Sequence, residues 1–140
     1  MTKPTKVRPT VERIKTVANF LPDLEAIGPG HLARTIRTPE GDIVLGCVEY
    51  HPAVHKFEKA CYENGFIQTF DWSAWAPTAR RFMRNPELIA SARLSTCIKL
   101  ITAHIRCERL CDGHLQEVFS SGHISAILRR LLQLAERSSG

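Results

Sequence analysis

Several features that define common protein classes are missing from this 140-residue sequence. No apolar run approaches the ~20 residues that a membrane span needs, and no apolar stretch follows the basic amino terminus as in a secretory signal. The chain also lacks a Gly-x-Ser-x-Gly elbow, a phosphate-binding loop and a dinucleotide fingerprint, and it has no internal repeat. These absences favour a cytoplasmic protein and argue against the enzyme classes that those motifs define.

Aromatic residues make up 7% of the chain, and its five cysteines are an odd number, which does not suit a complete set of disulfides. In a reducing compartment we expect these cysteines to be buried thiols that behave as small hydrophobic groups. The length is that of one domain. We therefore predict a disordered basic arm over residues 1–9 and a single globular domain over residues 10–140.

The formal net charge of +5 is moderate, and it comes from three separate clusters. No aromatic residues interleave with these clusters, as a platform for single-stranded nucleic acid would require. Each cluster alone is best interpreted as a solvated helix face, although basic surfaces also suit nucleic acid or acidic proteins. The clusters are Lys3, Lys6, Arg8, Arg13 and Lys15; Arg80, Arg81 and Arg84; and Arg129, Arg130 and Arg137.

The pattern of apolar and turn residues predicts a helix-rich α+β fold in which a small antiparallel sheet packs against a carboxy-terminal helical bundle. Residues 91–134 contain no proline and indicate three helices separated by two tight turns. The other predicted elements are a helix from Thr10 to Pro22, a hairpin of residues 32–37 and 43–50, a helix from Pro52 to Gly65, a helical turn capped by Asp71, and a helix that begins at Asn85-Pro86.

The first of the three carboxy-terminal helices carries two polar residues, His104 and Glu108, in the middle of its apolar face. Four residues apart, they can form a pair that raises the pKa of the histidine. Either this pair stabilises helix packing, or Glu108 orients His104 in a cleft as an acid, base or ligand-binding group. The predicted apolar face comprises Leu94, Cys97, Ile98, Ile101, Ile105 and Cys111, and the opposite face Lys99, Thr102, Arg106 and Arg109.

A zinc-like spacing, His104-x2-Cys107-x3-Cys111-x2-His114, overlaps this helix. On one continuous helix, His104 and His114 would be about 15 Å apart, too far for a single tetrahedral ion. We therefore expect no metal and no cofactor.

Two turns share a pattern, Gly113-His114 and Gly122-His123, in which a glycine ends one helix and a histidine begins the next. Free amides at a helix start favour anions and lower the pKa of a histidine. The histidines are either incidental residues after a common helix stop or part of an anion site at adjacent helix ends.

Three segments of the sequence resemble a bacterial family of small domains of unknown function. They are Phe70-Asp71-Trp72-Ser73-Ala74-Trp75; residues 102–115, with Thr102-Ala103-His104-Ile105-Arg106, Arg109 and Cys111-Asp112-Gly113-His114-Leu115; and residues 121–128, which begin Ser121-Gly122-His123. The resemblance covers roughly residues 50 to 132 and implies a compact bacterial cytoplasmic protein. It does not indicate an activity, because none is established for the family. Members of the family carry small or acidic residues at the places of Cys107 and Glu108, so Cys107 looks like a local departure, which further weakens the metal interpretation.

Together these observations predict a binding protein with a polar-edged pocket for an anionic small molecule or nucleotide. One alternative is a basic docking protein, encoded by a phage or mobile element, that inhibits a nucleic-acid-handling complex. A second is an enzyme that uses His104 and Glu108 as an acid–base pair. The predicted ligand-binding residues are Trp72, Trp75, His104, Arg106, Glu108, Arg109, His114 and His123, and none is predicted to be catalytic or to bind a metal.

Overall fold

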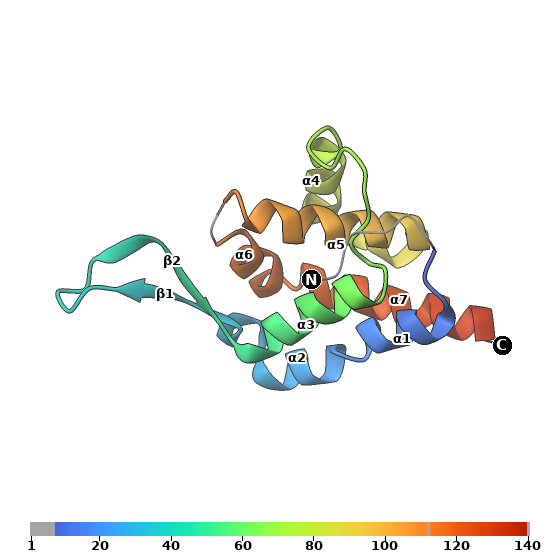
Figure 1. Cartoon of the computed structure of the whole chain (residues 1–140), viewed down its shortest axis with the longest axis horizontal. Helices are drawn as coiled ribbons and strands as arrows, with labels where there is room; N and C mark the ends of the chain where they lie inside the picture. The colour runs from blue at the N-terminus through green and yellow to red at the C-terminus, as the bar shows by residue number, and fades with distance from the viewer. Residues whose placement is uncertain (1–7, 112, 140) are drawn as a thin grey trace.

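Helices dominate the structure, a computed structural model that describes residues 8–111 and 113–139 (Figure 1). Within this part of the chain there are seven α-helices, two short 3-10 helices and one two-stranded antiparallel sheet. The predicted helix-rich α+β class is therefore confirmed. The elements are α1 (Val11–Ala18), α2 (Leu21–Ile27), η1 (Pro29–His31), β1 (Ala33–Arg37), β2 (Ile43–Tyr50), α3 (Pro52–Glu63), α4 (Ala76–Arg84), η2 (Pro86–Ser91), α5 (Leu94–Glu108), α6 (His114–Ser120) and α7 (His123–Ser139).

The first helix begins as predicted but ends earlier. The hydroxyl of Thr10 accepts a hydrogen bond from the amide of Arg13, which caps α1. Pro22 does not stop this helix, because α1 ends at Ala18 and Pro22 lies in the first turn of α2. Proline is tolerated there since the amide that it lacks would have no partner within the helix.

Residues 1–7 of the predicted arm lie outside the described residues. Pro9 is buried, so the packed part of the chain begins before residue 10.

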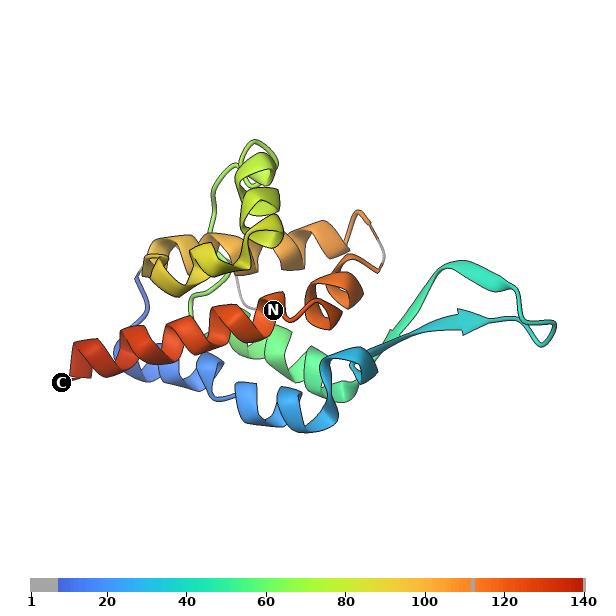
Figure 2. The ribbon, with the colours of Figure 1, turned by 180° about the vertical axis from the view of Figure 1, so that it is seen from behind.

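The predicted hairpin is confirmed as β1 and β2, which pair antiparallel with Ala33 opposite Tyr50 and Thr35 opposite Val48. Its strands extend away from the helices, as the front and back views show (Figures 1 and 2). Among the described residues of the hairpin, those at its base contribute to the site described below. There, Tyr50 packs against the main hydrophobic core.

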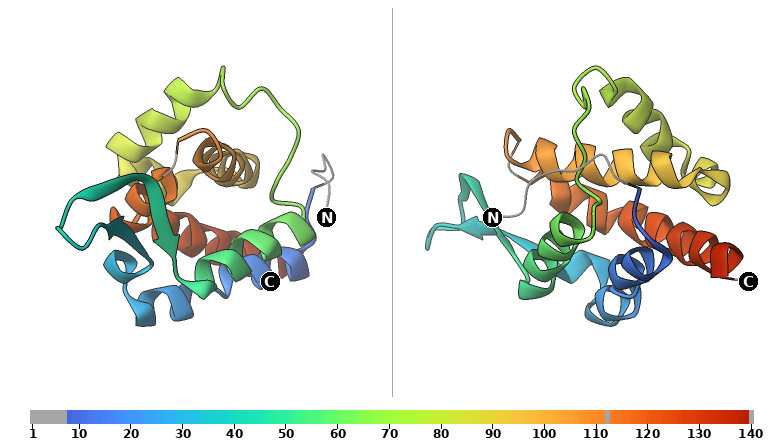
Figure 3. Two further views of the ribbon diagram at one scale, coloured as in Figure 1. Left: turned by 60° about the vertical axis from the view of Figure 1, so that its left-hand side comes forward. Right: turned by 45° about the vertical axis from the view of Figure 1, so that its right-hand side comes forward.

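The core forms around α5 and α7, and α7 contacts α1, α2, α5, α6 and η2. Figure 3 shows α4 across α5, joined to α3 by a long irregular connection. Thr102 was predicted on the exposed face of α5 but is fully buried. Its hydroxyl donates to the carbonyl of Phe66 at 2.8 Å and accepts from the amide of Gln68 at 3.1 Å. The prediction failed because the irregular segment after α3 covers a face that an amphipathic helix would expose.

The two predicted turns are present, with Gly113 at φ 94° and Gly122 at φ 81°. Only glycine adopts this left-handed backbone readily, so each turn ends one helix sharply. The segment from Pro86 to Ser91 forms a 3-10 helix. The arginines Arg80, Arg81 and Arg84 were expected on a helix face, but the bounds of that helix, α4, were not predicted.

The prediction that the cysteines are buried is correct for only some of them. Cys61 and Cys97 lie in the core, Cys107 is half-buried and Cys111 is exposed beyond the end of α5. The side chain of Cys47 lies outside the described part of the structure. In the ranges that the structure describes, no helix has both the length and the apolar character that crossing a membrane requires.

Candidate functional site

Three histidines that are far apart in sequence meet where α5, α6 and α7 converge. His104 lies on α5, while His114 and His123 are the first residues of α6 and α7. The ring centroid of His104 lies 5.2 Å from that of His114 and 4.8 Å from that of His123. The predicted 15 Å separation of His104 and His114 is wrong, because α5 ends at Glu108 and the turn at Gly113 folds α6 back beside it.

Nδ1 of His104 and Nε2 of His114 are 3.0 Å apart, so one imidazole donates a hydrogen bond and the other accepts it. His104 is only 2% exposed, and its second ring nitrogen, Nε2, is buried with no hydrogen-bond partner among the described residues. The same holds for both ring nitrogens of His123. A buried polar atom without a partner costs about 1–3 kcal/mol, which makes the cluster a strong candidate for a functional site.

All three imidazoles are neutral at physiological pH. Burial lowers the pKa of His104 well below its usual value, and the neighbouring His123 and His114 lower it further. Burial lowers the pKa of His114, against the opposing charges of Glu117 and Glu108, and it lowers the pKa of His123 to about 4. The predicted rise in the pKa of His104 is therefore wrong, and burial rather than the helix start dominates at the other two histidines.

Glu108 does not pair with His104 as predicted but holds the turn between α5 and α6. Its Oε1 accepts hydrogen bonds from the Tyr50 hydroxyl and the Leu115 amide, both at 2.8 Å, and its Oε2 accepts one from the Gly113 amide at 3.2 Å. The carboxylate thus satisfies free amides at the start of α6 and ties that turn to the base of the hairpin. Because His114 is the first residue of α6, Glu108 positions it indirectly.

A pocket of about 510 Å³ lies against the histidine pair, between α4, α5 and α6. His104 and His114 line it together with Arg80 and Arg84 of α4, and we call it the histidine pocket. Small side chains on the facing helices, Ala76, Ala79 and Ala103, also line it. Their small volume leaves the space that larger residues would fill.

Of the predicted ligand-binding residues, the structure brings Trp72, His104 and His114 together in this pocket. His123 contacts the ring of His104 but does not line the pocket.

The other predicted residues lie elsewhere. Trp75 packs edge-on against Phe70, at 5.9 Å between ring centroids. Arg109 is exposed and donates a hydrogen bond to the Tyr62 hydroxyl, while Arg106 and Glu108 are half-buried outside the pocket lining.

Sequence reasoning missed the two pocket arginines. Arg80 and Arg84 were identified as part of a basic cluster but not as ligand-binding residues. Their spacing of four residues places both on one face of a helix, which is the signal that could have indicated a shared site. Glu117 of α6, also missed, is a carboxylate in the lining.

The arrangement restricts the chemistry available in the pocket. In the part of the chain that the structure covers, no group of three or more His, Cys, Asp or Glu side chains is placed to hold a metal ion. Burial raises the pKa of the Cys107 thiol in the pocket, with Cys111 and Glu108 contributing, so this thiol is protonated at neutral pH. The other functional groups in the lining are two arginine cations, one carboxylate, neutral imidazoles, the Ser121 hydroxyl, the Met83 thioether and the ring of Trp72.

Fold and site together define a helix-rich α+β protein with a polar pocket beside a buried histidine cluster. Residues 9–137 match the model of a family described as a family of unknown function (DUF6508), and the chain belongs to this family. The match extends the predicted resemblance, which covered residues 50 to 132, almost to the amino terminus. The bacterial origin stays a prediction. No curated protein and no solved structure matches the chain.

Proposed function

We propose that this protein binds an anionic small molecule of the nucleotide type in the histidine pocket. The observation that carries the proposal is His104, a buried side chain with an unpartnered nitrogen, in the lining of a pocket that also contains two arginines. The volume of about 510 Å³ lies within the range of roughly 300–1,000 Å³ that small-molecule sites occupy.

Each group in the pocket has a distinct part in this proposal. Arg80 and Arg84 supply the positive charge for a phosphate, since the histidines are neutral. As neutral imidazoles, His104 and His114 can donate or accept hydrogen bonds, and they would recognise polar groups of the ligand in this way. Trp72 offers an aromatic face for a base.

A titration with AMP tests this function. In a Trp75→Phe background Trp72 is the single remaining tryptophan of the two in the chain, so its fluorescence reports on the pocket. We expect AMP to quench this fluorescence, and we expect Arg80→Ala or Arg84→Ala to weaken binding roughly tenfold each, the effect of losing one charge-assisted hydrogen bond.

Arg81→Ala is the matched control, because Arg81 is exposed on the same helix but does not line the pocket. It should leave the affinity unchanged. If AMP and other nucleoside monophosphates leave the fluorescence unchanged, or if all three arginine variants weaken binding equally, the proposal is wrong.

A catalytic function is the second candidate, and the short contact between His104 and His114 favours it, because two neutral imidazoles can relay a proton. It does not use the His104–Glu108 pair, since Glu108 bonds elsewhere. The test is turnover. If nucleotide incubated with the wild type is recovered unchanged, the protein binds without catalysis.

A further inference from the structure

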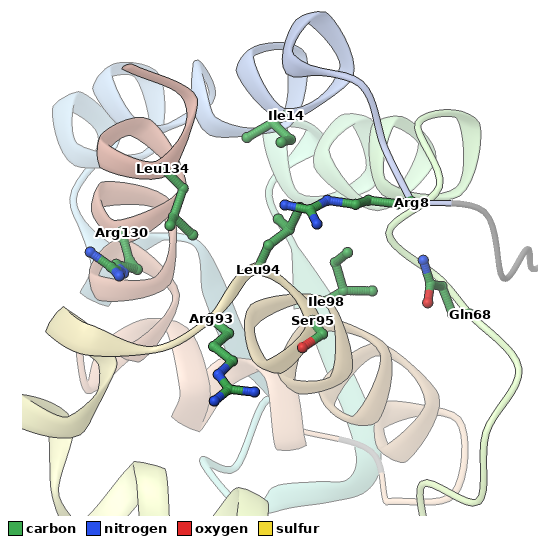
Figure 4. A pocket seen from close by; sticks show the side chains of 9 residues that line it. All are labelled: Arg8, Ile14, Gln68, Arg93, Leu94, Ser95, Ile98, Arg130 and Leu134. Atoms are coloured by element: carbon green, nitrogen blue, oxygen red, sulfur yellow. The ribbon is translucent and has the colours of Figure 1, made fainter. Parts of the chain in front are cut away.

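A second pocket, of about 500 Å³, lies on another part of the molecule, where α1, the start of α5 and α7 meet (Figure 4). No residue lines both this pocket and the histidine pocket. Three arginines line it from three different segments: Arg8 from the stretch before α1, Arg93 from the residue before α5, and Arg130 from α7. We call it the arginine pocket.

The charge of the arginine pocket is not balanced from within. Its lining contains no aspartate or glutamate among the described residues. Arg130 is 7% exposed, and its Nε donates to the Ala92 carbonyl at 2.8 Å while its Nη1 donates to the Gln133 side-chain oxygen at 3.2 Å. Both acceptors are neutral, so these bonds fix the guanidinium without neutralising it. Burying a cation costs free energy unless an anion is near, and the pocket therefore favours an anionic ligand.

The start of α5 adds to this preference. The helix is 15 residues long, its N-cap residue Arg93 has extended backbone, and no side chain caps its first amides. Leu94 and Ser95 of this first turn line the pocket. Amides at a helix start attract anions, and the Ser95 hydroxyl is a further donor. The arginines and the helix start thus favour the same sign of charge.

The remaining lining defines the rest of the ligand. Ile14, Ile98 and Leu134, with Leu94, form an apolar part of the wall beside the polar groups. Inorganic phosphate would use the charges and leave this apolar surface uncovered, whereas a ligand with an apolar body would cover both. We propose that the arginine pocket binds an organic phosphate monoester, with the phosphoryl group among the polar lining groups and the organic group against the apolar wall.

Phenyl phosphate is a suitable probe, because it combines a dianionic phosphoryl group with a small apolar ring. Binding is followed through the backbone amide resonances of Leu94 and Ser95 in the full chain. The Arg80→Ala/Arg84→Ala variant is titrated in parallel, so that a signal from the histidine pocket cannot be mistaken for this one. We expect the same shifts in both proteins, weaker shifts with inorganic phosphate or benzoate, and none with phenol.

Arg8→Ala and Arg93→Ala should each weaken phenyl phosphate binding about tenfold, as the loss of one charge-assisted hydrogen bond implies. Both residues are exposed, so neither variant should unfold the protein. Arg13→Ala is the matched control, since Arg13 is an exposed arginine on α1 outside the lining.

Three results would overturn this assignment: benzoate binding as tightly as phenyl phosphate, an equal loss in Arg13→Ala, or no shift at Leu94 and Ser95. Failure of AMP at the histidine pocket would leave it standing, because the two sites share no lining residue.

Discussion

At the scale of single residues, Glu108 shows how one carboxylate can organise a site without belonging to it. It accepts hydrogen bonds from one hydroxyl and two amides across the turn that separates His104 from His114. The sequence indicated that a polar group at this position must have a partner. It could not indicate the partner, because Tyr50 is 58 residues away and the amides belong to a turn whose geometry depends on Gly113.

Glu108→Ala should destabilise the fold by about 3 kcal/mol, because three donors lose an acceptor that carries charge. Tyr50→Phe removes one of these bonds, together with the bond that the Tyr50 hydroxyl accepts from the Gln116 amide, and should cost about 1–2 kcal/mol. Urea unfolding monitored by circular dichroism measures both values. Glu63→Ala, at an exposed site on α3, is the control and should stay within about 0.5 kcal/mol. An equal effect of Glu63→Ala and Glu108→Ala would contradict this account.

His123 should make the protein sensitive to acid. Its pKa falls from 6.5 in the unfolded chain to about 4 in the folded protein, through burial and then the neighbouring His114. Above pH 6.5 both states are neutral and the stability is complete. As the pH falls from 6.5 towards 4, His123 binds a proton in the unfolded state but not in the folded state, so the free energy of unfolding decreases. The loss from this residue amounts to roughly 3 kcal/mol.

His123→Phe removes this dependence together with two buried nitrogens that have no partner. We expect stability near that of the wild type at neutral pH, within about 1 kcal/mol, and a smaller loss on acidification. Unfolding by urea at a series of pH values measures the difference. His55→Phe, at an exposed position, should keep the wild-type profile, and the same profile in His123→Phe would show that His123 is not responsible.

At the scale of elements, the segment before α4 gives different surroundings to two tryptophans that were both predicted to bind the ligand. The Asp71 carboxylate caps the turn as predicted, accepting from the Ala74 amide at 3.1 Å. Both tryptophans are half-buried. Trp75 packs against the core, and the centroid of its ring lies 6.0 Å from Nζ of Lys99. Trp72, in contrast, lines the histidine pocket. One indole is therefore mainly structural and the other is placed for binding.

Trp75→Ala should cost about 2–3 kcal/mol, somewhat less than the loss of a fully buried indole. Trp72→Ala should cost about 1 kcal/mol of stability and should weaken AMP binding, since the ligand loses its stacking surface. Thermal unfolding and calorimetric titration separate the two effects. The opposite pattern, with Trp75→Ala impairing only binding, would refute this division.

Elements were predictable where a local signal is strong and unopposed. The hairpin, the capped start of α1, α3, and the two glycine turns of the carboxy-terminal helices all follow from residues close in sequence. The predictions failed where distant segments decide the outcome. Thr102 is buried because residues after α3 cover it, and the bounds of α4 were not predicted. The pocket itself depends on α4 lying across α5, which no local pattern encodes.

At the scale of the whole molecule, several basic residues of the described structure already have a partner or a place in a pocket. In the described structure Arg129 forms an ion pair with Glu25, and Arg130 is buried, so these two residues of the third cluster make contacts within the fold. Arg80 and Arg84 line one pocket, and Arg8 lines the other. This distribution favours small anions over an extended polyanion such as duplex DNA.

The dependence of binding on salt distinguishes these two kinds of partner. A ligand held by two arginines should lose about tenfold or less in affinity as salt rises from low to physiological concentration, whereas a protein that contacts 6–10 phosphates loses about 10³–10⁵. Arg80→Glu should abolish AMP binding by reversing a charge in the pocket, while Arg129→Glu should leave the affinity for AMP unchanged.

For duplex DNA, we expect weak binding that is lost at physiological salt. Both charge reversals should reduce this binding equally, because it depends only on net charge. Calorimetry with AMP and fluorescence anisotropy with labelled DNA provide the two measurements. Tight DNA binding that depends on Arg129 more than on Arg80 would instead establish a docking surface and exclude the pocket as the main site.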